Sequence, residues 1–126
     1  MTDKKLVLIV EDNENLSDTC CRALIAAEYE VQTAFTLAEA RQRLESAVPN
    51  VILLDVNLPD GSGIDFCREI RASVSAFIFF LSSLSDFEYE FKCLEAGGDD
   101  FLLKPFSIDL LRSRVARCIQ CLQRGS

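Results

Sequence analysis

Three acidic side chains lie at the ends of two runs of strand-forming residues, in a pattern typical of a divalent metal site. Asp55 closes the apolar run V-I-L-L-D, and Glu11 and Asp12 directly follow the run L-V-L-I-V. A carboxylate at the end of a buried strand is costly unless its charge is compensated. A divalent cation shared by the three carboxylates is the simplest explanation of this arrangement.

Mg²⁺ fits these ligands, because it takes one or two carboxylates in octahedral geometry and keeps several waters. We expect Asp12 and Asp55 to bind it directly, and Glu11 to bind it directly or through a water molecule. Asn57, two residues after Asp55, could add its backbone carbonyl.

A hydroxyl and an ammonium group are expected at the same edge, since Ser82 ends the fourth predicted strand and Lys104 the fifth. Together with a metal and the Asp55 nucleophile, they have the chemistry of a phosphoryl-transfer site. Aspartate is a weak nucleophile, so positioning and charge neutralisation must activate it. The chain has no histidine, so the phosphoryl group must come from another molecule.

Apolar strands and amphipathic helices alternate five times along the chain. This pattern predicts an α/β fold, a doubly wound parallel sheet with helices on both faces. In such sheets, ligands bind beyond the carboxyl ends of the strands, where strand order reverses. Thr36 and Ser107 stand at expected helix N-caps, and Gly97–Gly98 at an expected C-cap. The predicted strands are 6–10, 30–34, 51–55, 76–81 and 100–103, and the predicted helices are 15–27, 37–47, 63–72, 87–96 and 108–122.

The composition is that of one soluble domain. The chain has 126 residues, of which 49% are hydrophobic and 26% charged, enough for one core and too few for two domains. Its net charge of -7 argues against nucleic-acid binding by this chain. Of the acids, only Asp109 lies after Lys104, so the last helix could be a basic face. No apolar run approaches the ~20 residues of a membrane span, and the N-terminus lacks a signal-peptide pattern, so we expect a cytoplasmic protein.

The six cysteines are expected to be reduced. Cys20, Cys67, Cys93 and Cys118 fall at apolar positions of helical patterns, as packing residues do. Cys118 and Cys121 form a C-x-x-C motif, but a zinc site would need a second pair or histidines, and a redox motif would stand at a helix start. We expect Cys121 to be exposed.

From about Lys5 to Leu122, the sequence resembles the receiver domain of two-component response regulators. The resemblance implies a (βα)5 domain with the flavodoxin-like strand order 2-1-3-4-5. It covers one domain, residues 1–126, which could be a fragment of a longer regulator. Four segments carry it in order and at the family's spacing: the E-D pair at Glu11, L-L-D-V-N-L-P-D-G-S-G around Asp55, F-L-S-S around Ser82, and G-G-D-D-F-L-L-K-P-F around Lys104.

The resemblance also implies a role for each residue of the site. Asp55 accepts a phosphoryl group from a phosphohistidine on a partner histidine kinase. Mg²⁺, held by Asp12, Asp55 and Glu11, offsets charge on the transferring group. Lys104 contacts a phosphoryl oxygen, and the Lys104–Pro105 peptide bond is expected to be cis.

Two residues are expected to carry the signal away from the site. Ser82, where threonine is commoner, bonds another phosphoryl oxygen and shifts toward it. Phe101, which lacks the hydroxyl of a tyrosine, then turns into the space that Ser82 leaves. Leu84 and Asn57 are expected to tune water access to the phospho-aspartate, so that Leu84 alters its hydrolysis rate.

The last segments resemble receivers of winged-helix transcription factors, in which the fourth helix, fifth strand and fifth helix form a two-fold dimer face. Lys92 and Asp109 stand where one intersubunit pair is expected, and Asp100 and Arg114 where another is. Each could instead pair within one chain or be solvated. Such pairs would set register more than affinity, since surface pairs contribute only about 0–1 kcal/mol. DNA binding would belong to a C-terminal effector domain beyond this chain.

Alternative interpretations remain open on the sequence. A flavin-binding electron carrier shares the fold, but E-D-N-E-N stands where it needs a phosphate cradle. A pseudo-receiver would scaffold partners without being phosphorylated, and the complete set of acids, serine and lysine argues against it. Taken singly, the acidic pair could be a solvated turn, Lys104 a surface charge, Ser82 a helix cap and Phe101 a core residue. Asp60 and Asp65 are interpreted as turn and helix-start residues rather than ligands.

Overall fold

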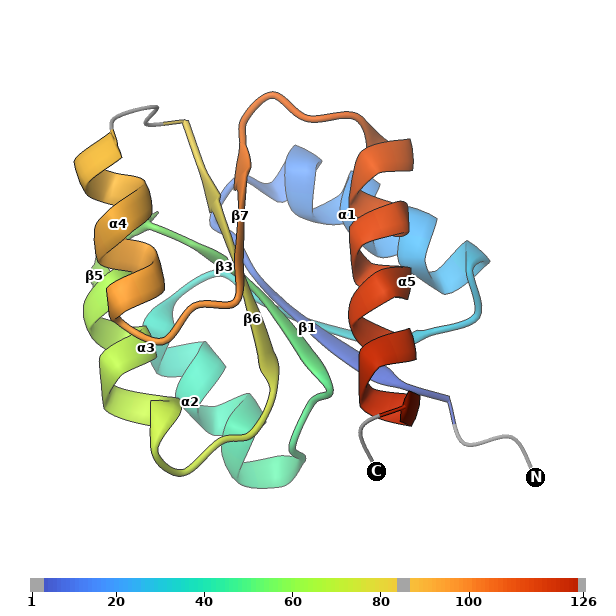
Figure 1. Ribbon diagram of the computed structural model, residues 1–126, viewed down its shortest axis with the longest axis horizontal. Helices are drawn as coiled ribbons and strands as arrows, with labels where there is room; N and C mark the ends of the chain where they lie inside the picture. Colours follow the sequence, from blue (N-terminus) through green and yellow to red (C-terminus); the bar gives the residue numbers. More distant parts are fainter. Residues whose placement is uncertain (1–3, 84–86, 125–126) are drawn as a thin grey trace.

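A sheet of five parallel strands forms the centre of the protein (Figure 1). The computed structural model describes residues 4–83 and 87–124. The order β2-β1-β3-β6-β7 confirms the predicted order 2-1-3-4-5, and every pairing in this sheet is parallel. Its strands are β1 (Leu6–Val10), β2 (Glu30–Ala34), β3 (Val51–Asp55), β6 (Phe77–Ser82) and β7 (Asp100–Leu103).

Five helices cover the sheet, two on one face and three on the other (Figure 1). Each lies where the sequence predicted one, with bounds that differ by at most two residues. On one face lie α1 (Glu14–Ala26) and α5 (Ile108–Arg124), and on the other α2 (Leu37–Ser46), α3 (Gly63–Arg71) and α4 (Phe87–Glu95).

The sheet separates two apolar cores, because successive residues of a strand point to opposite faces. The α2–α3–α4 core takes Leu8 and Val10 of β1, whereas the α1–α5 core takes Val7 and Ile9. All four side chains are 0–1% exposed. The same alternation along β3 and β6 explains why these strands are apolar up to their last residues, Asp55 and Ser82, as expected for a sheet covered on both sides.

Between β3 and α3 the chain forms a short antiparallel hairpin, β4 (Asn57–Leu58) and β5 (Gly61–Ser62). No predicted strand or helix covered residues 56–62, between the strand at 51–55 and the helix at 63–72. The hairpin lies directly after Asp55, so it borders the carboxyl edge of the sheet.

The expected helix caps are confirmed. Thr36 Oγ1 accepts from the Glu39 N–H at 3.1 Å, and Ser107 Oγ accepts from the Leu110 N–H at 3.0 Å. Gly97 has a φ of 108° just after α4, a conformation that glycine adopts without strain.

The four cysteines predicted to pack in the core are buried, and Cys121 is exposed. Burial raises the pKa of Cys20, Cys93 and Cys118 to about 11, so these thiols remain protonated at neutral pH. All six are free thiols. The four buried cysteines pack as small apolar side chains, as predicted.

No helix in the described part of the chain has the length and apolar character needed to cross a membrane.

Replacing Glu28 by glycine should stabilise the protein. Glu28 has a φ of 72° at the end of α1, and this left-handed conformation costs a residue with a Cβ roughly 1–2 kcal/mol. The extra freedom of glycine in the unfolded chain offsets roughly 0.5–1 kcal/mol of that gain. We expect the free energy of unfolding, measured in urea, to rise by about 0.5–1 kcal/mol.

The control is Glu45→Gly, which removes the same charge within α2 and should be destabilising. A Glu28→Gly variant no more stable than wild type would contradict the strain at this position.

Candidate functional site

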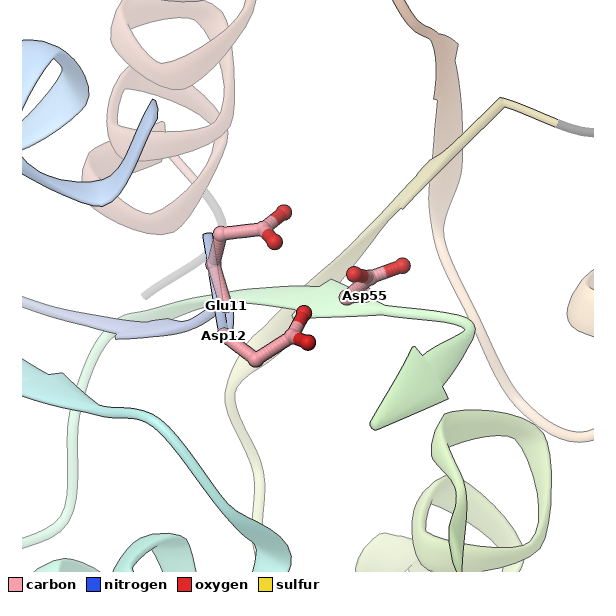
Figure 2. A group of neighbouring side chains, drawn as sticks. All are labelled: Glu11, Asp12 and Asp55. Atoms are coloured by element: carbon pink, nitrogen blue, oxygen red, sulfur yellow. The ribbon is translucent and has the colours of Figure 1, made fainter. Parts of the chain in front are cut away.

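The three acids singled out in the sequence converge at the carboxyl edge of the sheet. One oxygen from each of Glu11, Asp12 and Asp55 can be chosen so that all lie within 4.8 Å of one another. Figure 2 shows the three carboxylates directed toward the same space beside the end of β3. The register explains this, because Val10 of β1 pairs with Leu54 of β3, which sets the following residues side by side.

These carboxylates differ in exposure. Glu11 is 1% exposed and Asp55 7% exposed, whereas Asp12 faces solvent. Glu11 Oε2 accepts from the backbone N–H of Asn13 at 3.0 Å, and Asp55 Oδ1 accepts from the backbone N–H of Asn57 at 3.2 Å. Glu11 and Asp55 therefore lie below the surface of the protein, and Asp12 lies at the surface.

Lys104 supplies the positive charge at this edge. Its Nζ lies 2.5 Å from Glu11 Oε1 and 3.2 Å from Asp55 Oδ2. Its backbone N–H donates to the carbonyl of Ser82 at 2.7 Å, which fixes the start of the β7–α5 loop against β6. The Lys104–Pro105 peptide bond is cis, as expected.

The pKa values of Glu11 and of Lys104 are both raised, for different physical reasons. Burial raises the pKa of Glu11, and the charge of Asp55 raises it further. The hydrogen bonds from Lys104 and Asn13 lower this pKa, but the net shift is upward. Burial lowers the pKa of Lys104, but the hydrogen bond to Glu11 and the charges of Asp55 and Glu11 outweigh it, so the net shift is upward. Lys104 therefore stays an ammonium ion near neutral pH.

The donor set fits a hard divalent cation. Mg²⁺ holds its oxygen ligands at 2.0–2.1 Å, so two ligands on one ion lie about 3–4 Å apart. The carboxylate oxygens, within 4.8 Å of one another, need only a small inward movement to reach this spacing. Both oxygens of Glu11 and both oxygens of Asp55 already accept hydrogen bonds, whereas Asp12 is exposed to solvent.

The two residues expected to relay a signal lie on neighbouring strands. Ser82 ends β6 and is 1% exposed. Phe101 pairs in register with Phe80, is half-buried, and packs against the α2–α3–α4 core. Leu84, expected to tune hydrolysis, lies outside the described residues.

A glycine allows the chain to pass close behind Asp55. A Cβ placed on Gly63, the first residue of α3, would lie 2.0 Å from the Asp55 carbonyl oxygen. The Gly63 N–H donates to the carbonyl of Val56 at 2.7 Å. The backbone of α3 therefore contacts the segment that carries Asp55, and only a residue without a Cβ fits there. Gly63 has no reactive side chain, so the sequence gave no signal of this role.

The residues predicted for a dimer face have partners within the chain. Arg114 Nη1 lies 2.7 Å from Asp100 Oδ2, Asp109 contacts Arg112, and Lys92 Nζ lies 5.7 Å from the centre of the Tyr89 ring. These contacts are the within-chain alternative that the sequence left open. Pairing between two chains stays a prediction.

One residue set aside in the sequence analysis makes a long-range contact. Asp60, interpreted as a turn residue, accepts from the backbone N–H groups of Leu37 at 2.8 Å and Ala38 at 3.0 Å. Asp60 does lie in a turn, as predicted, but the sequence gave no signal that its carboxylate contacts the start of α2.

Comparison with known proteins agrees with this geometry. Residues 7–116 match the response regulator receiver domain family. The chain belongs to this family. The receiver domain is 38% identical over 109 residues to the uncharacterized transcriptional regulatory protein YrkP of Bacillus subtilis, covering 86% of this chain and 47% of YrkP. It is 37% identical over 109 residues to the KDP operon transcriptional regulatory protein KdpE of Escherichia coli, covering 86% and 48%.

Among solved structures, the response regulator DrrB, described as a Thermotoga maritima OmpR/PhoB homolog, matches this receiver domain with a TM-score of 0.83. The two are 32% identical, and the match covers 98% of this chain and 55% of DrrB. The receiver domain spans about half the length of the curated relatives it matches. These relatives are transcriptional regulatory proteins, which agrees with the transcription-factor subfamily that the sequence resembles.

Removing the Lys104 ammonium should destabilise the receiver domain in a pH-dependent way. Lys104→Met leaves the Glu11 carboxylate buried without its cation, a change that costs about 3 kcal/mol for a buried pair. In the folded protein the pKa of Glu11 is already raised above its ordinary value of 4.5. Losing the Lys104 ammonium raises this pKa further. Stability therefore falls as pH rises above 4.5, so the variant should lose more in alkaline than in mildly acidic buffer.

Urea denaturation in EDTA, repeated across pH, measures this loss. The double variant Glu11→Gln/Lys104→Met has no buried carboxylate at this position and should show little of the pH dependence. An equally large loss at every pH would contradict a role of Lys104 in neutralising Glu11.

Proposed function

We propose that this receiver domain is a phosphorylation-dependent signalling switch, in which Asp55 accepts a phosphoryl group from a phosphohistidine of a partner sensor histidine kinase. One observation carries the proposal. A nearly buried Asp55 carboxylate lies 3.2 Å from the Lys104 ammonium, and Glu11 and Asp12 converge on the same space.

The transfer uses the two oxygens of Asp55 differently. One carboxylate oxygen attacks phosphorus, the bond between phosphorus and the histidine nitrogen breaks, and the imidazole leaves with that electron pair. The Asn57 N–H holds Oδ1 and the Lys104 ammonium contacts Oδ2, so the carboxylate is oriented before the donor arrives. Asp12, Asp55, Glu11 and the Asn57 carbonyl would hold Mg²⁺, which when bound offsets charge on the phosphoryl oxygens.

Phosphorylation adds roughly -1.5 to -2 charge to a group that is already crowded by carboxylates. Lys104 stands beside the accepting oxygen, so its ammonium can contact a phosphoryl oxygen after a small movement. That movement would weaken its hydrogen bond to Glu11. The charge of the phosphoryl group would thus act on Lys104, and through it on the end of β7.

The relay proceeds from β6 to β7. The Ser82 hydroxyl bonds another phosphoryl oxygen and moves toward it, and Phe101 turns into the space that is released. Phe101 packs on the α2–α3–α4 core, so its rotation acts on the surface formed by α4, β7 and α5. We call this surface the α4-β7-α5 face.

The α4-β7-α5 face is suited to contact a second copy of the chain after phosphorylation. Its α4, β7 and α5 segments carry four large apolar side chains that are 40–64% exposed: Phe91, Leu94, Leu103 and Leu110. Charged residues accompany them: Lys92, Asp100, Asp109 and Arg114. In a dimer, the Asp100–Arg114 pair within each chain would break, and Asp100 of one chain would pair with Arg114 of the other. The proposed output is transcription, with DNA bound by a further domain of the regulator. We place the protein in the cytoplasm, where response regulators typically work.

A pseudo-receiver that scaffolds partners without phosphorylation is the alternative. It gives no reason for Asp12, Asp55, Ser82 and Lys104 to be present together at one edge. The alternative is therefore less well supported than phosphoryl acceptance.

The proposal predicts phosphorylation by a small donor. Wild-type protein incubated with acetyl phosphate and Mg²⁺ should gain the mass of one phosphoryl group in intact mass spectrometry. Asp55→Asn removes the nucleophile, and EDTA removes the cation, so neither sample should gain that mass. No addition to wild type, or an addition that survives Asp55→Asn, would favour the scaffold.

Dimerisation through the α4-β7-α5 face gives a second prediction. Beryllofluoride with Mg²⁺, as a phosphoryl mimic, should raise the dimer fraction of wild type in sedimentation velocity. Arg114→Glu places like charges at the expected pair and should abolish the increase. Arg22→Glu, on α1 and outside this face, is the control and should dimerise as wild type does.

The double exchange Asp100→Arg/Arg114→Asp restores opposite charges and should recover dimers. An Arg114→Glu variant that dimerises normally would exclude this face.

A further inference from the structure

The β4–β5 hairpin joins the site to a helix that has no part in the chemistry proposed above. Its first residue, Asn57, donates its N–H to Asp55 Oδ1 at 3.2 Å. Its turn carries Asp60, whose two carboxylate oxygens accept from the N–H groups of Leu37 and Ala38 at 2.8 and 3.0 Å. The hairpin therefore contacts Asp55 at one end and α2 at the other.

The contact with α2 is a helix cap supplied from a distant part of the chain. The first N–H groups of a helix lack partners within the helix. In α2 the Thr36 side chain accepts from the Glu39 N–H, which is one of these groups. Asp60, more than twenty residues away along the chain, accepts from two more, the N–H groups of Leu37 and Ala38.

The charge of Asp60 suits this position. A carboxylate is favoured at the positive end of a helix dipole, and the hydrogen bond from the Leu37 N–H holds the pKa of Asp60 below its ordinary value. Asp60 is therefore an anion at neutral pH, with one oxygen for each N–H. Asparagine could accept only one of these hydrogen bonds, because its NH₂ group is a donor.

The hairpin is also held by packing. Leu58 is buried in the α2–α3–α4 core, and Leu37 Cδ1 lies 3.0 Å from the point where a Cβ on Gly61 would stand. Leu37, the first residue of α2, therefore packs against the turn that its own N–H binds.

The helix that receives Asp60 is braced against α3. Arg41 makes a two-pronged hydrogen bond to Glu69, with both N···O distances at 2.8 Å. Its guanidinium carbon lies 5.3 Å from the centre of the Phe66 ring. Because α3 begins at Gly63, beside the Asp55 backbone, α2 is a support whose position relative to the site is fixed.

We infer that Asp60 is a positioning residue of the phosphoryl site: by tying the hairpin to α2, it holds Asn57 where its N–H orients Asp55 and its carbonyl can bind the metal. The inference rests on the proposed function, because it assigns Asp60 a role at the proposed Mg²⁺ site. Asp60 itself contacts neither the metal nor the phosphoryl group. It acts through the backbone of Asn57.

The test compares Asp60→Asn with two matched controls. Asp65→Asn removes the same charge from an exposed acid in the first turn of α3, and so measures the effect of charge alone. Thr36→Ala removes a different cap of the same helix end, and so measures the effect of weakening α2. Each variant is first checked by urea denaturation to be folded.

Two readouts separate positioning from stability. Isothermal titration with Mg²⁺ should give a Kd about tenfold higher for Asp60→Asn, the smaller end of the loss seen when a residue that orients a metal ligand is removed. Hydrogen exchange without metal should be faster in the hairpin, residues 56–62, for Asp60→Asn. The two controls should keep a Kd close to that of wild type, and Thr36→Ala should speed exchange in α2 rather than in the hairpin.

The possible failures are distinguishable. If wild type binds Mg²⁺ and is phosphorylated, but Asp60→Asn matches it in Kd and in hairpin exchange, the positioning role is overturned and the proposed function stands. If Thr36→Ala weakens Mg²⁺ binding as much as Asp60→Asn does, Asp60 acts only by stabilising α2, and the inference is also overturned. If wild type neither binds Mg²⁺ nor accepts a phosphoryl group, the proposed function fails and the inference fails with it.

Discussion

The ammonium of Lys104, shared between Glu11 and Asp55, is the interaction on which the carboxyl edge of the sheet depends. It joins the ends of β1 and β3 to the residue that follows β7. Two unit charges 4 Å apart attract by about 4 kcal/mol at the effective dielectric near a protein surface, while removing each ion from water costs several kcal/mol. These terms nearly balance, so the site is stable only while its charges match. If the site takes up a cation and a phosphoryl group, as proposed, this balance of charge changes and Lys104 is expected to move.

Much of the fold and the position of the acidic cluster could be predicted, because both depend on local patterns. The apolar runs of β3 and β6 are explained by a sheet covered on both sides, and alternating strands and helices leave few topologies. Once β1 and β3 are parallel neighbours, Asp12 and Asp55 must meet, since both follow their strands at the same edge. The prediction of the acidic cluster needed only the order of the strands and the chemistry of carboxylates.

The remaining features depend on contacts between residues far apart in the sequence. Asp60 reads as an ordinary turn residue, and only the packing of the hairpin against α2 gives its carboxylate two N–H partners. Asp100 and Arg114 could pair within one chain or between two, and sequence spacing does not distinguish these possibilities. Glu28 occupies a left-handed conformation that glycine usually takes, so the chain offered no signal of the helix end there. In each case the missing information was the placement of one element against another.

Gly63 shows how a residue without a functional group can behave as part of a reactive centre. A methyl group at this position would overlap the carbonyl oxygen of Asp55, which stands 2.0 Å from where it would lie. Either α3 or the backbone of the acceptor must then move, and the Asp55 side chain moves with it. In a survey of all single substitutions scored by signalling output, this position would tolerate as little change as Asp55, the proposed nucleophile. Its intolerance would reflect excluded volume rather than chemistry.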